Sequence, residues 1–211
     1  MAEEEKESPD ASNQDEGSCS QFSAAGKSGT TWTWHFTDVY SAQSGMAGEW
    51  IVESADNAEG VWPVAVEGSL NSDSAEASFD YRSWSEYRCD EFGTWLLKQN
   101  GVRVYGDGSE TSSEAVFVDE LLVVPNTLSA GDSWESRSAV TVNVDGEIVE
   151  EEYEAAHFVN DVVSVSVPAG TWEQAIEIES SGPDGIGLWY IAEEVGAVSY
   201  ETSELTSWTP G

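Results

Sequence analysis

The stretch Trp189–Tyr200, WYIAEEVGAVSY, is the part of the sequence that best predicts the fold. An earlier stretch repeats its pattern: Tyr87–Gly93 reads YRCDEFG, and Tyr190–Gly196 reads YIAEEVG. Each consists of a Tyr, two further residues, two acids, one apolar residue and a Gly. Two acids before a Gly are typical of a polar turn, because Gly adopts backbone conformations that other residues rarely reach. We therefore expect a closing β-hairpin at each place.

A second motif precedes each of these two hairpins. Gly29–Trp32 (GTTW) and Gly131–Trp134 (GDSW) share the pattern GxxW, and each lies at nearly the same distance before the hairpin glycine. The matched spacing predicts two similar halves, residues 29–124 and 125–211, related by a weak internal repeat. We expect each half to supply a curved antiparallel sheet.

The balance of charge is extreme. The 211 residues include 41 Asp and Glu against seven Lys and Arg, which gives a formal net charge of −34. Such a surface repels phosphate groups, so we expect no nucleic-acid partner and no anionic membrane surface. Two explanations stay open: a high-salt environment, where salt screens the repulsion, or an exported bacterial protein with an acidic linker. No apolar run approaches the ~18 residues of a membrane-spanning helix.

The first 28 residues are acidic and then rich in Ser, Gly and Ala, with Phe22 as the one large hydrophobic residue. Such a composition does not offset the entropy of ordering, so residues 1–28 are predicted to be a disordered acidic tail. No signal-peptide pattern is present. Met1 before an acidic run is compatible with an exported protein whose signal peptide has been replaced by a start Met. It is equally compatible with the natural N-terminus of a cytosolic protein.

Cys19 and Cys89 are the only cysteines. An even count without a CxxC motif or a Cys/His cluster favours one disulfide over a zinc site. We therefore predict a Cys19–Cys89 disulfide, which requires an oxidising compartment. The alternative is two unrelated thiols, with Cys89 buried as a small hydrophobic residue.

Beyond the tail, the sequence has the pattern of β-strands. Polar and apolar residues alternate along Trp32–Phe36 and Val163–Val167, as expected for strands with one buried face. Asn100-Gly101 and Asp145-Gly146 are dipeptides typical of two-residue hairpin turns. Further turns are expected at Pro168–Gly170 and Gly182–Gly185. These features predict an all-β domain of curved antiparallel sheets, arranged as a half-barrel or a sandwich.

No motif in the sequence specifies a reaction. His35 and His157 each lack a second ligand at a known spacing, and neither a GxSxG nor an SxxK motif occurs. With so many acids, neighbouring carboxylates arise by chance. We therefore predict no enzymatic activity, no cofactor and no metal site. Calcium stays open as an alternative at Asp107–Glu110 and Pro183–Gly185.

The aromatic residues are the strongest indication of function. Most of the ten Trp residues lie in predicted strands and are expected to form the core. Some of them could instead line a concave face that binds an apolar ligand. The five residues predicted to contact such a ligand are Trp34, Phe36, Trp172, Ile176 and Trp189.

The second half resembles a group of exported bacterial proteins and lipoproteins of unknown function. The resemblance rests on Pro125 and Gly131–Trp134, on Val167–Trp172 (VPAGTW) and on Trp189–Gly196 (WYIAEEVG). These motifs are structural turns, so they indicate a fold more than an activity. The resemblance implies a curved antiparallel sheet similar to the lipoprotein-carrier half-barrels that hold acyl chains.

These observations lead to two functional expectations. The first is a non-catalytic exported binding or accessory protein that holds an apolar small molecule or a lipid in a concave sheet. The second is a structural or assembly subunit of a cell-surface complex, with another protein as its partner. Both place the chain in the periplasm, on the outer surface or outside the cell, and both are compatible with a lipid anchor. Whether the chain is a monomer or an assembly subunit stays open.

Overall fold

The computed structural model describes residues 19–37, 47–56, 60–71, 78–183 and 185–211. These residues form strands and turns and no helix. The strands are β1 (Thr31–Thr37), β2 (Ala47–Ser54), β3 (Val61–Asn71), β4 (Phe79–Cys89), β5 (Gly93–Tyr105), β6 (Glu110–Pro125), β7 (Ser133–Val144), β8 (Glu147–Val167), β9 (Gly170–Gly182), β10 (Gly185–Ala192), β11 (Gly196–Tyr200) and β12 (Ser203–Thr209). The prediction of an all-β fold of curved antiparallel strands is confirmed.

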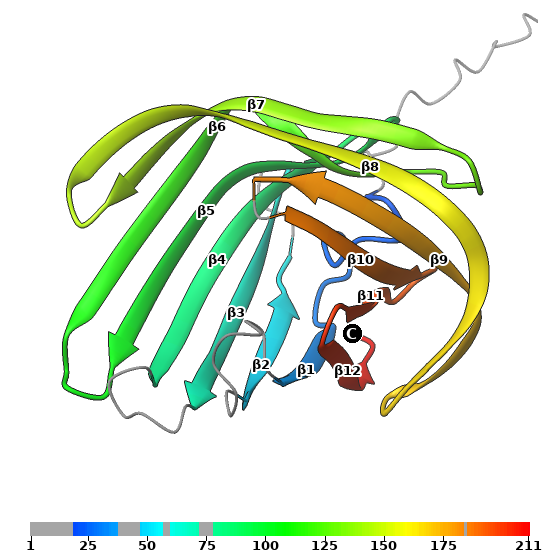
Figure 1. The fold of residues 1–211 in the computed structure, drawn as a ribbon, viewed down its shortest axis with the longest axis horizontal. Helices are drawn as coiled ribbons and strands as arrows, with labels where there is room; N and C mark the ends of the chain where they lie inside the picture. Colours follow the sequence, from blue (N-terminus) through cyan, green and yellow to red (C-terminus); the bar gives the residue numbers. More distant parts are fainter. Residues whose placement is uncertain (1–18, 38–46, 57–59, 72–77, 184) are drawn as a thin grey trace, which may run out of the picture.

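The twelve strands form one closed barrel in which each strand lies beside its neighbours in the sequence (Figure 1). The barrel closes where β1 pairs with β12. Trp34 of β1 lies opposite Leu205 of β12 on one side and opposite Trp50 of β2 on the other. The predicted half-barrel or sandwich is therefore corrected to a closed barrel, and every described strand has a hydrogen-bonded neighbour on both sides.

Three predicted turns are confirmed and one is wrong. Asp145-Gly146 lies between β7 and β8, Pro168–Gly170 joins β8 to β9, and Gly182–Gly185 joins β9 to β10. Asn100-Gly101 lies within β5, which continues to Tyr105. Neither residue has the positive φ that a two-residue hairpin turn requires. A Cβ atom at Gly101 would lie 3.2 Å from Ser113 Oγ and 3.2 Å from Tyr81 Oη, so this glycine permits close packing instead of a turn.

The paired motifs occupy corresponding places in the two halves. The GxxW motifs begin β1 and β7, and Gly29 and Gly131 have positive φ angles of 75° and 92°. Tyr87–Gly93 connects β4 to β5, and Tyr190–Gly196 connects β10 to β11. Both pairs of motifs are thus six strands apart. Each predicted half supplies six strands to the barrel, and both expected hairpins are present.

Residues 19–30, here called the plug segment, pack against one end of the barrel. The Cys19–Cys89 disulfide joins the segment to the end of β4, as predicted. Ser20 Oγ donates to the Pro125 carbonyl at 2.8 Å, and Phe22 is only 9% exposed. The predicted disordered tail is therefore wrong for residues 19–28, because the disulfide and the hydrogen bonds hold them. Residues 1–18 lie outside the described residues.

Many of the buried apolar side chains belong to two clusters. The first surrounds Val159 and Ile178 and includes Phe22 of the plug segment. The second surrounds Trp32 and Leu205, where β1 meets β12. Trp32 is 2% exposed, and its Nε1 donates to the Val195 carbonyl at 2.7 Å. Packing of the aromatic side chains thus holds the plug segment and joins the two ends of the sheet.

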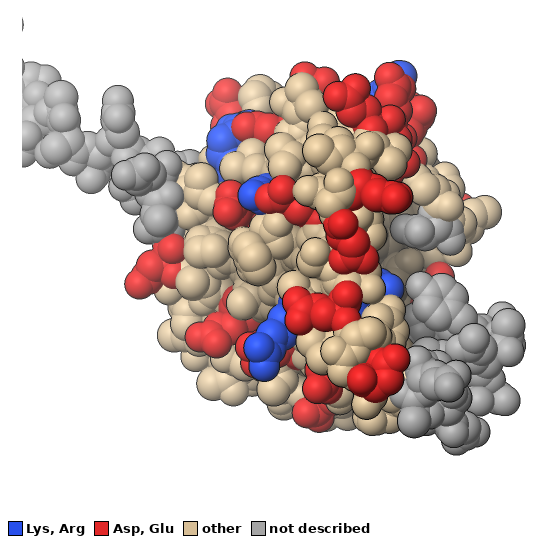
Figure 2. Space-filling model, turned by 90° about the vertical axis from the view of Figure 1, so that its left-hand side faces the viewer, with Lys and Arg blue, Asp and Glu red and all other residues tan. Residues whose placement is uncertain are grey.

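Acidic side chains are spread over the face shown in Figure 2, with few basic ones among them. The structure pairs some of the cations with acids on the neighbouring strand. Arg137 of β7 lies 2.9 Å from Glu152 of β8, and Lys98 of β5 pairs with Glu114 of β6. Exposed pairs of this kind contribute little to stability, and they relieve some of the repulsion between acids.

Candidate functional site

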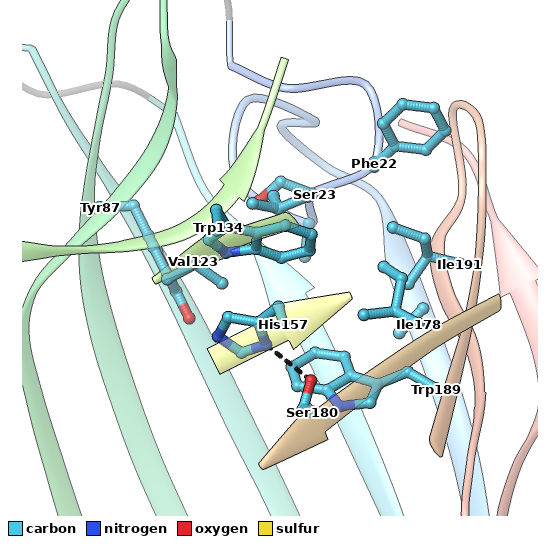
Figure 3. A pocket seen from close by; sticks show the side chains of 13 residues that line it. Phe22, Ser23, Tyr87, Val123, Trp134, His157, Ile178, Ser180, Trp189 and Ile191 are labelled. Carbon is cyan, nitrogen blue, oxygen red and sulfur yellow. Dashed lines mark hydrogen bonds between the residues drawn. The ribbon is translucent and has the colours of Figure 1, made fainter. Parts of the chain in front are cut away.

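An interior cavity of about 150 Å³ lies between the plug segment and strands β8, β9 and β10 (Figure 3). Because successive side chains of a strand point to opposite faces, Ile178 and Ser180 of β9 both reach it, as do Trp189 and Ile191 of β10. None of the residues that line it is charged. They are Phe22, Ser23, Ala24, Tyr87, Val123, Val124, Trp134, His157, Ile178, Ser180, Trp189, Ile191 and Ala197.

A chain of hydrogen bonds runs through His157, one of the polar residues of the cavity wall. Its Nε2 lies 2.9 Å from Ser136 Oγ, and its Nδ1 lies 2.6 Å from Ser180 Oγ. Ser136 Oγ also donates to the Leu122 carbonyl. The hydroxyl of Ser136 therefore accepts the proton of Nε2–H, and Ser180 donates to Nδ1. Both nitrogens of the imidazole are satisfied in its neutral form.

Two tryptophans enclose the His157 ring. Trp134 stacks on it with ring centroids 4.6 Å apart and 19° between the planes. Trp189 meets it edge to face, with centroids 6.2 Å apart. Burial lowers the pKa of His157 below its ordinary value, because the imidazolium would lose its hydration. The ring is therefore held neutral between aromatic neighbours.

The same two tryptophans carry unpaired hydrogen-bond donors. The Nε1 atoms of Trp134 and Trp189 are buried and have no hydrogen-bond partner among the described residues. A buried donor without a partner is unfavourable, and native structures contain few of them. Both donors belong to side chains that line the cavity and contact His157. The cavity wall therefore includes two tryptophans whose N–H groups are buried and unpaired.

A second hollow, a groove of about 500 Å³, lies beside the plug segment. Phe22 lines both the groove and the interior cavity. The groove also includes the charged residues Glu173 and Glu193. Its remaining lining residues are Gln21, Asn126, Thr127, Leu128, Val162, Trp172, Gln174, Ile176 and Ala192. The groove is therefore more polar than the cavity and is bordered by loops at the plugged end of the barrel.

The residues predicted to contact a ligand lie at three different places. Trp189 lines the interior cavity, and Trp172 and Ile176 line the groove. Trp34 packs against the core cluster around Trp32. Phe36 belongs to β1, and its side chain lies outside what the structure describes. The structure thus groups two of the five in one hollow, and their role in binding stays a prediction.

Sequence patterns gave little indication of three other cavity residues, Phe22, Trp134 and His157. Phe22 lies in a segment whose composition predicts disorder. Trp134 was recognised as part of a GxxW motif but not as a ligand contact. The sequence shows His157 only as a histidine without a second metal ligand, and the structure places it at a buried position on β8. Its neighbours Ala155 and Val159 are buried as well, so alternation along β8 was the signal that could have indicated the inward face.

In the part of the chain that the structure describes, no group of three or more His, Cys, Asp or Glu residues could hold a metal ion. That part also contains no helix of the length and apolarity needed to cross a membrane. Comparisons with protein-family models, curated proteins and solved structures found no match for the chain. The functional argument therefore rests on the geometry of the cavity.

Proposed function

We propose that the chain is a non-catalytic exported binding protein that holds a small apolar molecule in its interior cavity. The observation that carries the proposal is the uncharged, mainly apolar lining of a cavity of about 150 Å³. Protein cores contain few voids larger than a water molecule, so a cavity of this size is unusual. Apolar cavities of about 150 Å³ in other proteins take benzene or xenon. A compact, ring-sized molecule is therefore the expected ligand.

A lipid fits the interior cavity less well than a ring does, because an acyl chain needs a longer channel. The groove beside the plug segment is larger, and Trp172 and Ile176 give it an apolar wall. Glu173 and Glu193 at the same groove would repel an anionic headgroup. The size and charge of the two hollows thus favour a neutral small molecule.

The alternative function, an assembly subunit that joins its partners through exposed sheet edges, has less support. Such assembly requires a strand with unpaired N–H and C=O groups. Each described strand of the barrel is hydrogen-bonded to a neighbour on both sides. A partner would therefore have to bind side chains instead of extending the sheet.

An enzymatic role would use the Ser180–His157 pair, which resembles a nucleophile and its base. A hydrogen bond of 2.6 Å joins them, but the other nitrogen of His157 bonds to Ser136 and not to a carboxylate. A carboxylate in that place would stabilise the imidazolium that forms during acyl transfer.

We therefore expect Ser180 to stay unmodified when the folded protein is incubated with a fluorophosphonate ester and analysed by intact-mass spectrometry. Stoichiometric labelling of Ser180 would favour an enzyme instead.

The Cys19–Cys89 disulfide supports an oxidising, non-cytoplasmic location. We propose the periplasm, the outer surface or the extracellular space. A disulfide is stable there, and it would keep the plug segment against the cavity while a ligand is bound. Mass spectrometry of the protein from its source, prepared without reductant, tests this point. Two free thiols in that material would contradict it.

Benzene binding tests the proposed function directly. The disulfide-bonded protein is titrated with benzene, and binding is followed by the NMR signals of the tryptophan indole groups. Ala197→Leu adds volume to a side chain that lines the cavity, whereas Ala139→Leu adds the same volume at an exposed position of β7. We expect benzene to bind the wild type and Ala139→Leu and not Ala197→Leu. Absence of binding to the wild type would refute the proposal.

A further inference from the structure

We infer that Phe22 is the partition between the interior cavity and the groove beside the plug segment, and that it limits the size of the ligand. The inference deepens the proposed function and rests on it. Among the described residues, Phe22 is the only one that lines both hollows. In Figure 3 it lies at the edge of the side chains that line the cavity. Its aromatic ring therefore lies where the two hollows meet.

The two hollows lie next to each other along the same strands. On β9, Ile176 lines the groove and Ile178 lines the cavity. On β10, Ala192 lines the groove and Ile191 lines the cavity. Phe22 belongs to the same buried cluster as the three isoleucines. It therefore packs among wall residues of both hollows.

Phe22 differs from these isoleucines because no strand positions it. It lies in the plug segment, where the chain forms turns and bends. The Cys19–Cys89 disulfide fixes the start of this segment, and the backbone N–H of Phe22 donates to Ser20 Oγ at 3.3 Å. A change of the Phe22 side chain should therefore leave the strand pairing of the barrel intact.

The size of the space open to a ligand depends on this one side chain. With Phe22 in place, a ligand in the cavity is confined to about 150 Å³. Without the ring, the cavity would open into the groove of about 500 Å³. A longer molecule would then keep its ring in the cavity and extend a tail past Ile176 and Trp172 of the groove. Phe22 therefore selects compact rings over rings that carry a long substituent.

Benzene and 4-phenyl-1-butanol test the inference, because the second compound carries the same ring and a tail that ends in a hydroxyl group. A hydroxyl group is unfavourable in a closed apolar cavity and favourable in a polar groove. Both compounds are titrated into the disulfide-bonded protein, and binding is followed by the methyl NMR signals of Ile178 and Ile191. We expect the wild type to prefer benzene.

Phe22→Ala should change this preference. The ratio of 4-phenyl-1-butanol affinity to benzene affinity should rise roughly tenfold or more, because each tail methylene that becomes buried raises the affinity roughly fourfold. Phe22→Leu keeps apolar packing at the partition, so it should fold even where Phe22→Ala does not. In Phe22→Leu the ratio should rise by a smaller factor.

Val159→Ala is the matched control. Val159 belongs to the same cluster as Phe22 but lines neither hollow. The affinity ratio of this variant should equal that of the wild type. An equal rise in Val159→Ala and in the Phe22 variants would overturn the inference, because loosening of the cluster would then be sufficient.

The inference and the proposed function can fail separately. If benzene binds the wild type and the ratio is unchanged in Phe22→Leu, and in Phe22→Ala where that variant folds, the inference is wrong and the proposed function stands. If neither compound binds the wild type, both are wrong.

Discussion

The imidazole of His157 lies against the indole of Trp134, with ring centroids 4.6 Å apart and 19° between the ring planes. Both of its nitrogens are hydrogen-bonded to serine hydroxyl groups, so the ring is fixed in orientation as well as in position. The neutral form fits this environment, because a charged ring would lose hydration on burial. The packing of this part of the cavity wall therefore depends on His157 being neutral.

The first prediction concerns the dependence of stability on pH. Burial lowers the pKa of His157, so the unfolded chain binds a proton at a higher pH than the folded chain does. The corresponding stability is complete above about pH 6.5, the ordinary histidine pKa, and is lost as the pH falls from there towards the folded pKa. The loss should reach at most ~1.4 kcal/mol per pH unit.

Urea unfolding of the wild type and of His157→Gln at several pH values measures this loss. The free-energy difference between the two proteins should shrink as the pH falls below 6.5, the ordinary value for histidine. A ring-proton NMR titration of the folded wild type provides the control, with a midpoint below the ordinary histidine pKa. A difference that stays constant with pH would contradict the prediction.

The second prediction concerns the disulfide. Cys19 and Cys89 are 70 positions apart, and closing a loop of that length restricts the unfolded chain. Replacing both with Ser should lower the free energy of unfolding by ~4 kcal/mol. The plug segment should then be cleaved faster by proteases, because only the packing of Phe22 and hydrogen bonds such as that of Ser20 would still hold it.

Reductant provides the control for the disulfide. Added to the wild type, it should reproduce the stability and the protease sensitivity of the double Ser variant. Added to the variant, it should change neither. Equal stability of the oxidised wild type and the variant would show that the bridge does not hold the plug segment.

The third prediction compares two tryptophans. Trp32 Nε1 donates to the Val195 carbonyl, whereas Trp208 Nε1 is buried and has no partner among the described residues. Phe at either position removes an N–H group and some apolar area. Only Trp32→Phe leaves a buried carbonyl unpaired, so it should cost ~1–3 kcal/mol more than Trp208→Phe does. Urea unfolding of both variants at one pH measures the difference, and equal losses would contradict it.

The fourth prediction compares two reasons why a position requires glycine: lack of space for a side chain, and a positive φ angle. A Cβ at Gly93 would lie 2.4 Å from the Val124 carbonyl oxygen, so Gly93→Ala must push β5 and β6 apart. Gly131 has a φ of 92° and open space around a Cβ, so Gly131→Ala meets only backbone strain. We expect Gly131→Ala to lose ~1–2 kcal/mol and Gly93→Ala clearly more. Thermal unfolding of the two variants tests this order, and the reverse order would be inconsistent with the structure.

Residue types typical of turns predicted most of the turns correctly, but they also predicted a turn at a place where a strand continues. Asp145-Gly146 forms its hairpin because Asp145 and Gly146 both adopt positive φ. Asn100-Gly101 has the same chemistry but lies in a long strand that is paired on both sides. Cross-strand packing at Gly101 outweighs the turn preference there. Whether such a dipeptide forms a hairpin turn therefore depends on how the chain pairs and packs with the two adjacent strands.

Closure and the cavity could not be derived from local patterns. Thr31 pairs with Thr209, a contact between the two ends of the described chain. No residue near either position indicates such a partner. Phe22 stands among polar residues, so only the disulfide and the fold reveal that it is buried. Trp189 is predicted as a ligand contact from the aromatic residues of its strand, and it lines the cavity.

The pairing of β1 with β12 also has a kinetic consequence. A hairpin such as β7–β8 can form as soon as its two strands exist, but β1 gains its second partner only when β12 is present. Contacts between residues so far apart slow folding, because the entropy of closing the loop is lost before the contact is gained. During synthesis, the first strand must therefore remain half-paired until the last strand has emerged. We expect the barrel to fold slowly and to complete in a late, cooperative step.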